Sequence, residues 1–280
     1  MKKRLNGLFV LLPCVLGVMP IAACSLLIRP VNSSDNSSAY MEEKVEISYA
    51  GTYEIKDYYD LSSEKTYSNV LFLNCSVANN TNRTLKYMKI DSFKVYNFDN
   101  ELVAMNSWGC TGLLNLSSRQ RTTYPFLFQE KNTETLENGY YDPTYFTPTS
   151  DEVYARIEFT YVANPTPAYS GLTINYNSYH INSQYNTLVL NVDIVNDTGV
   201  TVKTLALNRF RVFHYDSENS KYTKVVDATF PNSATLNIAN GSSYNINNLT
   251  MAEGAYNGSF WNGTVNKNNI VVVSSINFTY

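Results

Sequence analysis

The chain repeats a long segment of its own sequence, and this repeat constrains the fold more than any other feature. Residues 71–99 (LFLNCSVANNTNRTLKYMKIDSFKVYNFD) align without a gap with residues 188–216 (LVLNVDIVNDTGVTVKTLALNRFRVFHYD), at a spacing of 117 residues and with ten identities. Farther along, NGYY at 138–141 matches NGSF at 257–260, and IEFTY at 157–161 matches INFTY at 276–280, at a spacing of 119. We infer a tandem duplication of a unit of about 115 residues.

Each unit has the residue pattern of strands. Every second residue from Leu71 to Val77 is apolar, and the second unit repeats this from Leu188 to Ile194, which is the period of a half-buried strand. Turn-forming Asn-x-Thr segments follow, and Tyr, Thr, Val and Ile dominate the later runs. The pattern predicts an all-β fold of two antiparallel β-sandwich domains, at residues 44–163 and 171–280. A proline-containing linker, residues 164–170, lies between them.

The N-terminus predicts export and a lipid anchor. Lys2, Lys3 and Arg4 precede an apolar run, and Ile-Ala-Ala-Cys follows at residues 21–24. This segment resembles the lipobox of bacterial lipoproteins. The resemblance implies that residues 1–23 are removed as a signal peptide, that the thiol of Cys24 receives diacylglycerol, and that residues 24–43 are the lipidated cysteine and a flexible tether.

Two other interpretations of the N-terminus remain open. Residues 8–28 are long and apolar enough for an uncleaved membrane anchor, or Cys24 is incidental to an ordinary cleavage site. Both the lipoprotein and the anchor predict an extracytoplasmic protein held at the membrane of a bacterial cell. In that setting we interpret the Asn-x-Thr segments at 79–81 and 196–198 as turn chemistry rather than glycan sites.

A second resemblance concerns the repeated unit. A strand ending in Asn and a turn, followed by a Phe-x-Val strand ending in Asp, resembles the Ig-like domains of the "immunoprotective extracellular" type on bacterial lipoproteins. Each unit matches over about its first half. The resemblance implies an exported Ig-like sandwich, and it implies no catalytic residues.

The cysteines allow one disulfide. After removal of the signal peptide only Cys24, Cys75 and Cys110 remain, and the lipid would block Cys24. Cys75 with Cys110 is therefore the one possible pair, in a compartment where disulfides persist. The alternative is two free thiols, and Val192 in place of Cys75 in the second unit shows that the fold does not need the bond.

Aromatic residues are the candidate contact residues. NGYYDPTYFTPT at 138–149 and NGSFWNGT at 257–264 place them in predicted loops, where aromatic side chains suit recognition of a sugar or a protein. The alternative is that some of them plug the end of each sandwich, and the 119-residue alignment of Tyr141 with Phe260 favours that role for these two. The candidate contact aromatics are Tyr140, Tyr145, Phe146 and Trp261, with Tyr145 and Trp261 as the best representatives.

Composition and motifs argue against nucleic-acid binding and against catalysis. The net charge is −3, and charged residues make up 16% of the chain without a basic block, so no nucleic-acid partner is expected. Neither a catalytic motif nor a metal-ligand spacing occurs, so we expect no enzyme activity, no cofactor and no metal. The sequence predicts a membrane-anchored surface lipoprotein that binds a protein or carbohydrate partner. The alternative is a cell-envelope accessory or small-ligand-binding lipoprotein.

Overall fold

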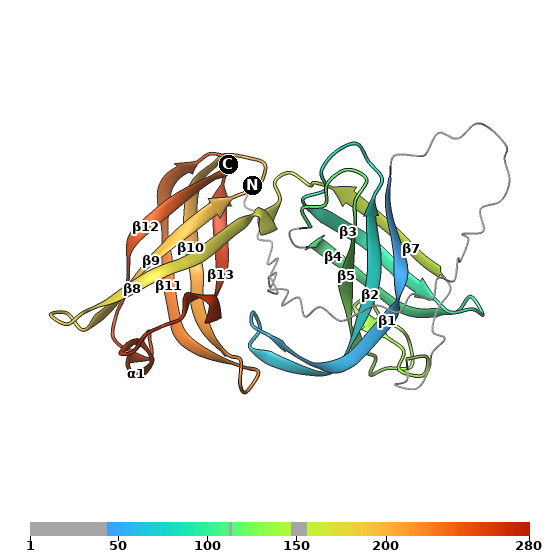
Figure 1. Cartoon of the computed structure of the whole chain (residues 1–280), viewed down its shortest axis with the longest axis horizontal. Helices are drawn as coiled ribbons and strands as arrows, with labels where there is room; N and C mark the ends of the chain where they lie inside the picture. The colour runs from blue at the N-terminus through green and yellow to red at the C-terminus, as the bar shows by residue number, and fades with distance from the viewer. Residues whose placement is uncertain (1–43, 112–113, 147–155) are drawn as a thin grey trace.

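The computed structural model describes residues 44–111, 114–146 and 156–280, and these residues form an almost entirely β structure (Figure 1). In the first half of the chain one sheet of seven strands, ordered β1–β2–β5–β6–β4–β3–β7, turns back on itself. Its pairs are antiparallel, except that β5 and β6 run parallel. The strands are β1 (Val45–Asp60), β2 (Lys65–Asn79), β3 (Met88–Tyr96), β4 (Leu102–Thr111), β5 (Arg121–Glu130), β6 (Tyr140–Tyr141) and β7 (Arg156–Ala163).

The second half forms two antiparallel sheets of three strands, ordered β12–β9–β8 and β11–β10–β13. Short helical turns precede β8 and lie between β12 and β13. The elements are η1 (Tyr169–Gly171), β8 (Leu172–Asn182), β9 (Thr187–Asn196), β10 (Val202–Asp216), β11 (Lys221–Ile238), β12 (Ser242–Met251), α1 (Gly258–Trp261), η2 (Lys267–Asn269) and β13 (Ile270–Thr279). The predicted all-β fold is confirmed.

The two halves share one strand plan, as a duplication requires. The β1–β2–β5 layer corresponds to β8–β9–β12, and the β4–β3–β7 layer corresponds to β11–β10–β13. Repeated residues also have equivalent neighbours, because Leu73 pairs with Tyr53 while Leu190 pairs with Tyr179. Strand pairs form within residues 45–163 and within 172–279, on either side of the predicted linker.

The predicted strand alternation fixes the core of each half. The alternate apolar side chains from Leu71 to Val77, and those from Leu188 to Ile194, are fully buried. Each set contributes to a separate hydrophobic cluster. In the first half the rings of Phe93 on β3 and Phe126 on β5 stack with centroids 4.6 Å apart, which joins the two layers. Burial of such large apolar side chains is the main term favouring each fold.

A buried asparagine closes the strand-to-turn junction in both halves. Asn79 is 0% exposed, and its Nδ2 donates to the carbonyls of Arg83 and Leu116 at 2.7 and 2.9 Å. Its Oδ1 accepts from the hydroxyl of Thr81 at 2.7 Å. In the second half Asn196, also 0% exposed, makes the same contacts with its own turn. The repeated Asn-x-Thr is therefore a structural lock, and its amide is too buried to carry a glycan.

Replacing the buried amide should unfold the chain more readily. In Asn79→Ala the carbonyls of Arg83 and Leu116 each lose one donor, and the hydroxyl of Thr81 loses its acceptor, which should lower the free energy of unfolding by about 2–3 kcal/mol. Urea denaturation followed by circular dichroism measures this. The control is Asn82→Ala, an exposed residue of the same turn, for which a change of less than about 0.5 kcal/mol is expected. Equal effects of the two changes would contradict the role given to Asn79.

Candidate functional site

Two of the four candidate contact aromatics are core residues, which corrects the sequence prediction. Trp261 is 1% exposed, and its indole Nε1 donates to the carbonyl of Val225 at 3.2 Å. Phe146 is 2% exposed and packs edge-on against Tyr53, with centroids 5.7 Å apart. Neither ring is available to a partner, because Phe146 belongs to the hydrophobic cluster of the first half and Trp261 to that of the second.

Contacts also correct the register of this region. The hydroxyl of Tyr141 donates to the carbonyl of Asn69 at 2.9 Å, and the hydroxyl of Tyr256 donates to that of Asn186 at 3.3 Å. Asn69 and Asn186 are 117 residues apart, so the partner of Tyr141 is Tyr256 rather than Phe260.

The same register holds for the five residues that follow Tyr141 and Tyr256. Asp142 and Asn257 each accept a hydrogen bond from a hydroxyl two residues on, and Phe146 corresponds to Trp261. The local spacing is therefore 115. The Asn-Gly match at 119 would place the helical turn α1 on the strand β6, whereas the spacing of 115 places it on the turn at 143–146.

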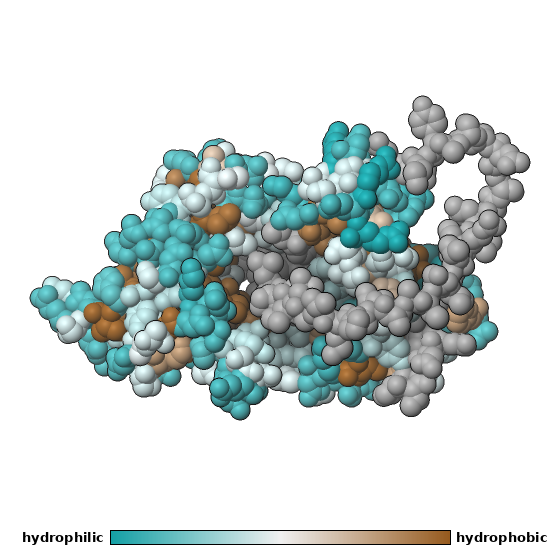
Figure 2. Space-filling view, in the orientation of Figure 1, coloured by the Kyte–Doolittle hydropathy of each residue, from teal (hydrophilic) through white to brown (hydrophobic). Residues whose placement is uncertain are grey.

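Tyr141 is 1% exposed, which confirms it as a core plug, whereas Phe260 is half-buried against the second core. Tyr145 is half-buried, and its hydroxyl donates to Glu101 Oε2 at 2.8 Å across an exposed loop. On the face seen in Figure 2 hydrophobic residues form small separate patches among polar ones. A single broad apolar contact surface is therefore not a feature of that face.

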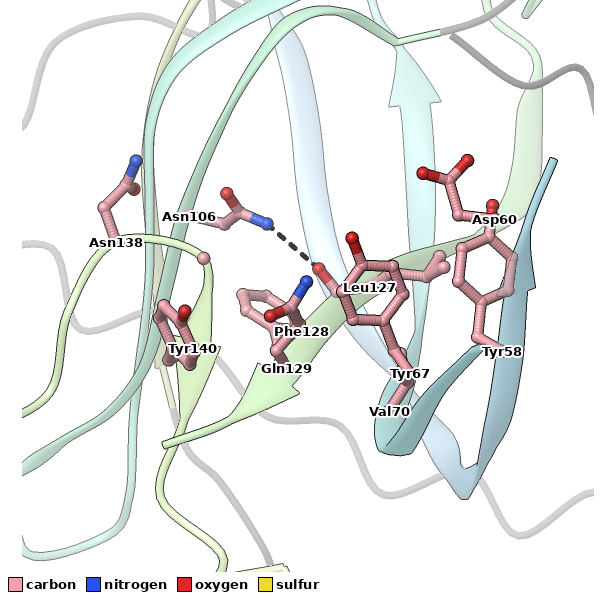
Figure 3. A pocket seen from close by; sticks show the side chains of 11 residues that line it. Tyr58, Asp60, Tyr67, Val70, Asn106, Leu127, Phe128, Gln129, Asn138 and Tyr140 are labelled. Atoms are coloured by element: carbon pink, nitrogen blue, oxygen red, sulfur yellow. Dashed lines mark hydrogen bonds between the residues drawn. The ribbon is translucent and has the colours of Figure 1, made fainter. Parts of the chain in front are cut away.

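Tyr140 does lie in a hollow, together with two tyrosines from a distant segment (Figure 3). We call this hollow the tyrosine pocket; its volume is about 360 Å³. It lies over the β1–β2 hairpin, β4, β5 and the segment that leads into β6. The lining residues are Tyr58, Asp60, Tyr67, Val70, Asn106, Leu127, Phe128, Gln129, Asn138, Gly139 and Tyr140.

Hydrogen-bonding groups line the pocket, and some of them are free to bind. Asn106 Nδ2 donates to the carbonyl of Leu127 at 3.0 Å, so this amide is held in place (Figure 3). Within the described part of the chain, the side chains of Tyr58, Gln129 and Tyr140 form no hydrogen bond. Phenols donate and accept, and an amide presents two donors and an acceptor. The pocket therefore offers rings for stacking together with unused polar groups.

The electrostatics of the pocket disfavour an anionic ligand. Partial burial opposes ionisation of Asp60, but hydrogen bonds from Ser62 and Ser63 hold the pKa of its carboxyl below the usual value. Burial, with a smaller contribution from Asp60, raises the pKa of Tyr58 to about 12. At neutral pH the pocket thus contains a carboxylate and a neutral phenol. Its lining includes no lysine or arginine to attract an anion.

An insertion supplies three of the eleven lining residues of the pocket. Between the paired residues Lys56 and Val70 the first hairpin contains residues 57–69, thirteen in number. The equivalent hairpin of the second half, between Asn182 and Thr187, contains only residues 183–186. We call residues 57–69 the arm. Tyr58, Asp60 and Tyr67 belong to it. The sequence analysis missed them, although a gap of nine residues between otherwise parallel repeats, filled with three tyrosines, was a visible signal.

The remaining predicted sites are only partly described. Cys75 is a free, fully buried thiol, and burial raises its pKa. The side chain of Cys110 lies outside the described residues. The Cys75–Cys110 disulfide therefore stays a prediction. Cys24 and the whole N-terminal segment also lie outside them. In the described ranges no helix is long and apolar enough to cross a membrane. Nor do those ranges gather three His, Cys, Asp or Glu residues into a possible metal site.

Comparison with known proteins leaves the chain without a family assignment. No protein-family model matches it, and no curated protein is similar to it at a significant level. The functional argument therefore rests on the geometry of the tyrosine pocket.

The contrast between Trp261 and Tyr145 is directly testable. Trp261→Ala leaves a large cavity and removes one of the two donors to the carbonyl of Val225, and should lower the free energy of unfolding by about 3–5 kcal/mol. Tyr145→Ala removes a half-buried ring at the edge of the first core and its hydrogen bond to Glu101, and should cost only about 1–2 kcal/mol. Thermal and urea unfolding of the two variants measure the difference. A Trp261→Ala protein as stable as the parent chain would contradict the placement of Trp261 in the core.

Proposed function

We propose that this chain is an exported, lipid-anchored, non-catalytic binding protein. It recognises an uncharged, hydroxyl-rich group, such as a sugar residue of a glycan, through the tyrosine pocket. One observation carries the ligand class. Tyr58, Tyr67 and Tyr140 surround a hollow that also contains amides and a single carboxylate. Binding sites of this size combine aromatic walls with a few polar groups that orient the ligand.

Sugars suit these groups better than anionic ligands do. Aromatic rings accept the apolar face of a pyranose, and side-chain amides both donate to and accept from its hydroxyls. The ionised Asp60 would repel phosphate or carboxylate groups. A volume of about 360 Å³ holds one or two sugar residues. The same volume suits a free small solute, which keeps a solute-binding lipoprotein as the second candidate.

The anchor and the domain type belong to the same proposal. The lipobox-like residues 21–24 support attachment through Cys24 at the outer face of a bacterial membrane. The chain places β1 and β2 in one layer, β3 and β4 in the other, β5 in the first and β7 in the second. This alternation supports an Ig-like sandwich. Incorporation of labelled palmitate into the chain, and its loss in Cys24→Ser, tests the anchor.

Glycan binding is tested with the full chain purified in a sugar-free detergent. The chain is applied to arrayed glycans, and glucose, galactose, mannose and N-acetylglucosamine are titrated by saturation-transfer NMR. Tyr140→Ala and Gln129→Ala should each weaken binding about tenfold or more, because a stacking surface or an orienting amide is lost. The melting temperature is checked for both variants.

The matched control is Tyr185→Ala. Tyr185 is 67% exposed and lies in the β8–β9 turn, away from the pocket lining, so its loss should leave binding unchanged. Binding that survives both pocket changes would place the ligand elsewhere. Preference for a free solute over every glycan would select the second candidate, and no binding to either class would reject the pocket as a ligand site.

A further inference from the structure

The arm has two faces with different surroundings. Side chains of successive strand residues point to opposite sides. Tyr58 and Asp60 line the tyrosine pocket, whereas Tyr59 and Leu61 contact the second half of the chain. Figure 1 shows the β1–β2 hairpin extending from its own sandwich to the β10–β11 hairpin. One short segment therefore belongs to the pocket wall and to the contact between the halves.

Apolar contacts seat the tip of the arm on the second half. Leu61 is 2% exposed and packs in one cluster with Phe213 of β10 and Val273 of β13, which are 0% and 7% exposed. The rings of Tyr59 and Tyr222 stack with centroids 6.3 Å apart. The side chain of Leu61 is thus as buried as a core residue. A contact of this kind stabilises a docked position through the same apolar burial that stabilises a core.

Charged groups surround the apolar contact and fix its geometry. Arg211 is 2% exposed, and its Nη1 donates to the carbonyls of Leu61 and Ser62 at 3.1 and 2.8 Å and to Glu64 Oε1 at 3.0 Å. Glu64 also receives Arg209 Nη2 at 2.7 Å and Lys224 Nζ at 2.8 Å. Three cations of the second half therefore converge on one carboxylate at the tip of the arm.

We propose that docking of the arm on β10, β11 and β13 holds Tyr58 and Tyr67 in the tyrosine pocket, so that the second half of the chain controls ligand binding in the first. The inference rests on the proposed function for its biological meaning, but not for its geometry. Tyr58 and Tyr67 are paired across the hairpin, only a few residues from Leu61 and Glu64. Glu64 and Arg211 act as positioning residues, because neither lines the pocket.

Acid should release the arm. Although partial burial opposes it, hydrogen bonds from Lys224 and Arg211 hold the pKa of Glu64 below its ordinary value of 4.5. The contribution of Glu64 to docking of the arm is therefore complete above pH 4.5, and it is lost as the pH falls through the lowered pKa of Glu64. The other ionisable groups around it are three cations, two carboxylates and a neutral phenol. Hydrogen bonding to Arg209 lowers the pKa of Asp227 to about 2, and hydrogen bonds from Ser62 and Ser63, opposed by partial burial, lower that of Asp60. The surrounding groups are Arg209, Arg211, Lys224, Asp227, Tyr59 and Asp60.

The test uses the full chain with ring-labelled tyrosine and compares NMR signals of Tyr58, Tyr67 and Tyr59, assigned through single Tyr→Phe changes. Glu64→Gln removes the charge that the three cations share, and Arg211→Met keeps the packing but removes the donors. In either variant the signals of all three rings should shift or broaden, and monosaccharide binding should weaken about tenfold. Lowering the pH from above 4.5 through the lowered pKa of Glu64 should reproduce the shifts in the parent chain. Glu253→Gln, an exposed glutamate of the second half, is the charge-matched control.

The outcomes separate this inference from the proposed function. If Tyr59 moves while Tyr58 and Tyr67 keep their signals in both variants, the arm is released without affecting the pocket, and the inference is overturned. Unchanged signals for all three rings would show that Glu64 and Arg211 do not hold the arm, which overturns it as well. If the parent chain binds none of the four monosaccharides, the proposed ligand class fails, and the ring signals still decide whether docking positions the pocket.

Discussion

The burial of Arg211 beneath the arm is the constraint on which the arrangement of the two halves depends. A guanidinium that is 2% exposed needs partners, because an uncompensated buried charge costs several kcal/mol. Among the described residues its Nε has no hydrogen-bond partner, so the bonds from Nη1 to the arm carry much of the compensation. Loss of the arm would leave Arg211 and the apolar surface of Phe213 open to water.

A second contact lies near the linker, and it acts together with the arm. Tyr87 of the first half packs on Ala168, and Lys86 approaches Asp197 of the second half at 3.7 Å. This contact is small, since Tyr87 and Ala168 are buried but the Lys86–Asp197 pair is partly exposed and adds little. The arm contact lies at the far end of the β1–β2 hairpin. At that position it opposes rotation of the two halves more effectively than the contact near the linker. The two contacts together restrict rotation of one sandwich against the other.

Divergence between the repeats accounts for the candidate site. Both halves keep the strand plan, the buried Asn79 or Asn196, and the hydroxyl of Tyr141 or Tyr256 bonded beside the hairpin. The thirteen residues of the arm break this symmetry. They form one wall of the tyrosine pocket and also the contact that docks the arm on the second half. A duplicated scaffold can gain a site in this way without change to its cores, because a hairpin tip tolerates insertion.

Much of the fold was predictable from the sequence, whereas most of the site was not. Period-two alternation around Leu71 and Leu188 predicted buried strands, because one face of each strand must meet the core. The roles of Trp261 and Phe146 could not be predicted in this way, since a loop position does not show which rings turn inward. The pocket unites Tyr58 with Tyr140, far apart in sequence, and only the pairing of β2 with β5 and of β5 with β6 brings them together.

The measurement that tests the account most directly is the distance distribution between two spin labels, introduced as unnatural amino acids at the exposed Asn82 and Asn248. It is made in the parent chain and in a chain whose residues 57–69 are replaced by the four residues 183–186 of the second hairpin. If the arm fixes the halves, the parent gives a narrow distribution and the replacement gives a broad one, with both cores still folded. An equally narrow distribution in both chains would show that the arm does not hold them, and would contradict the account.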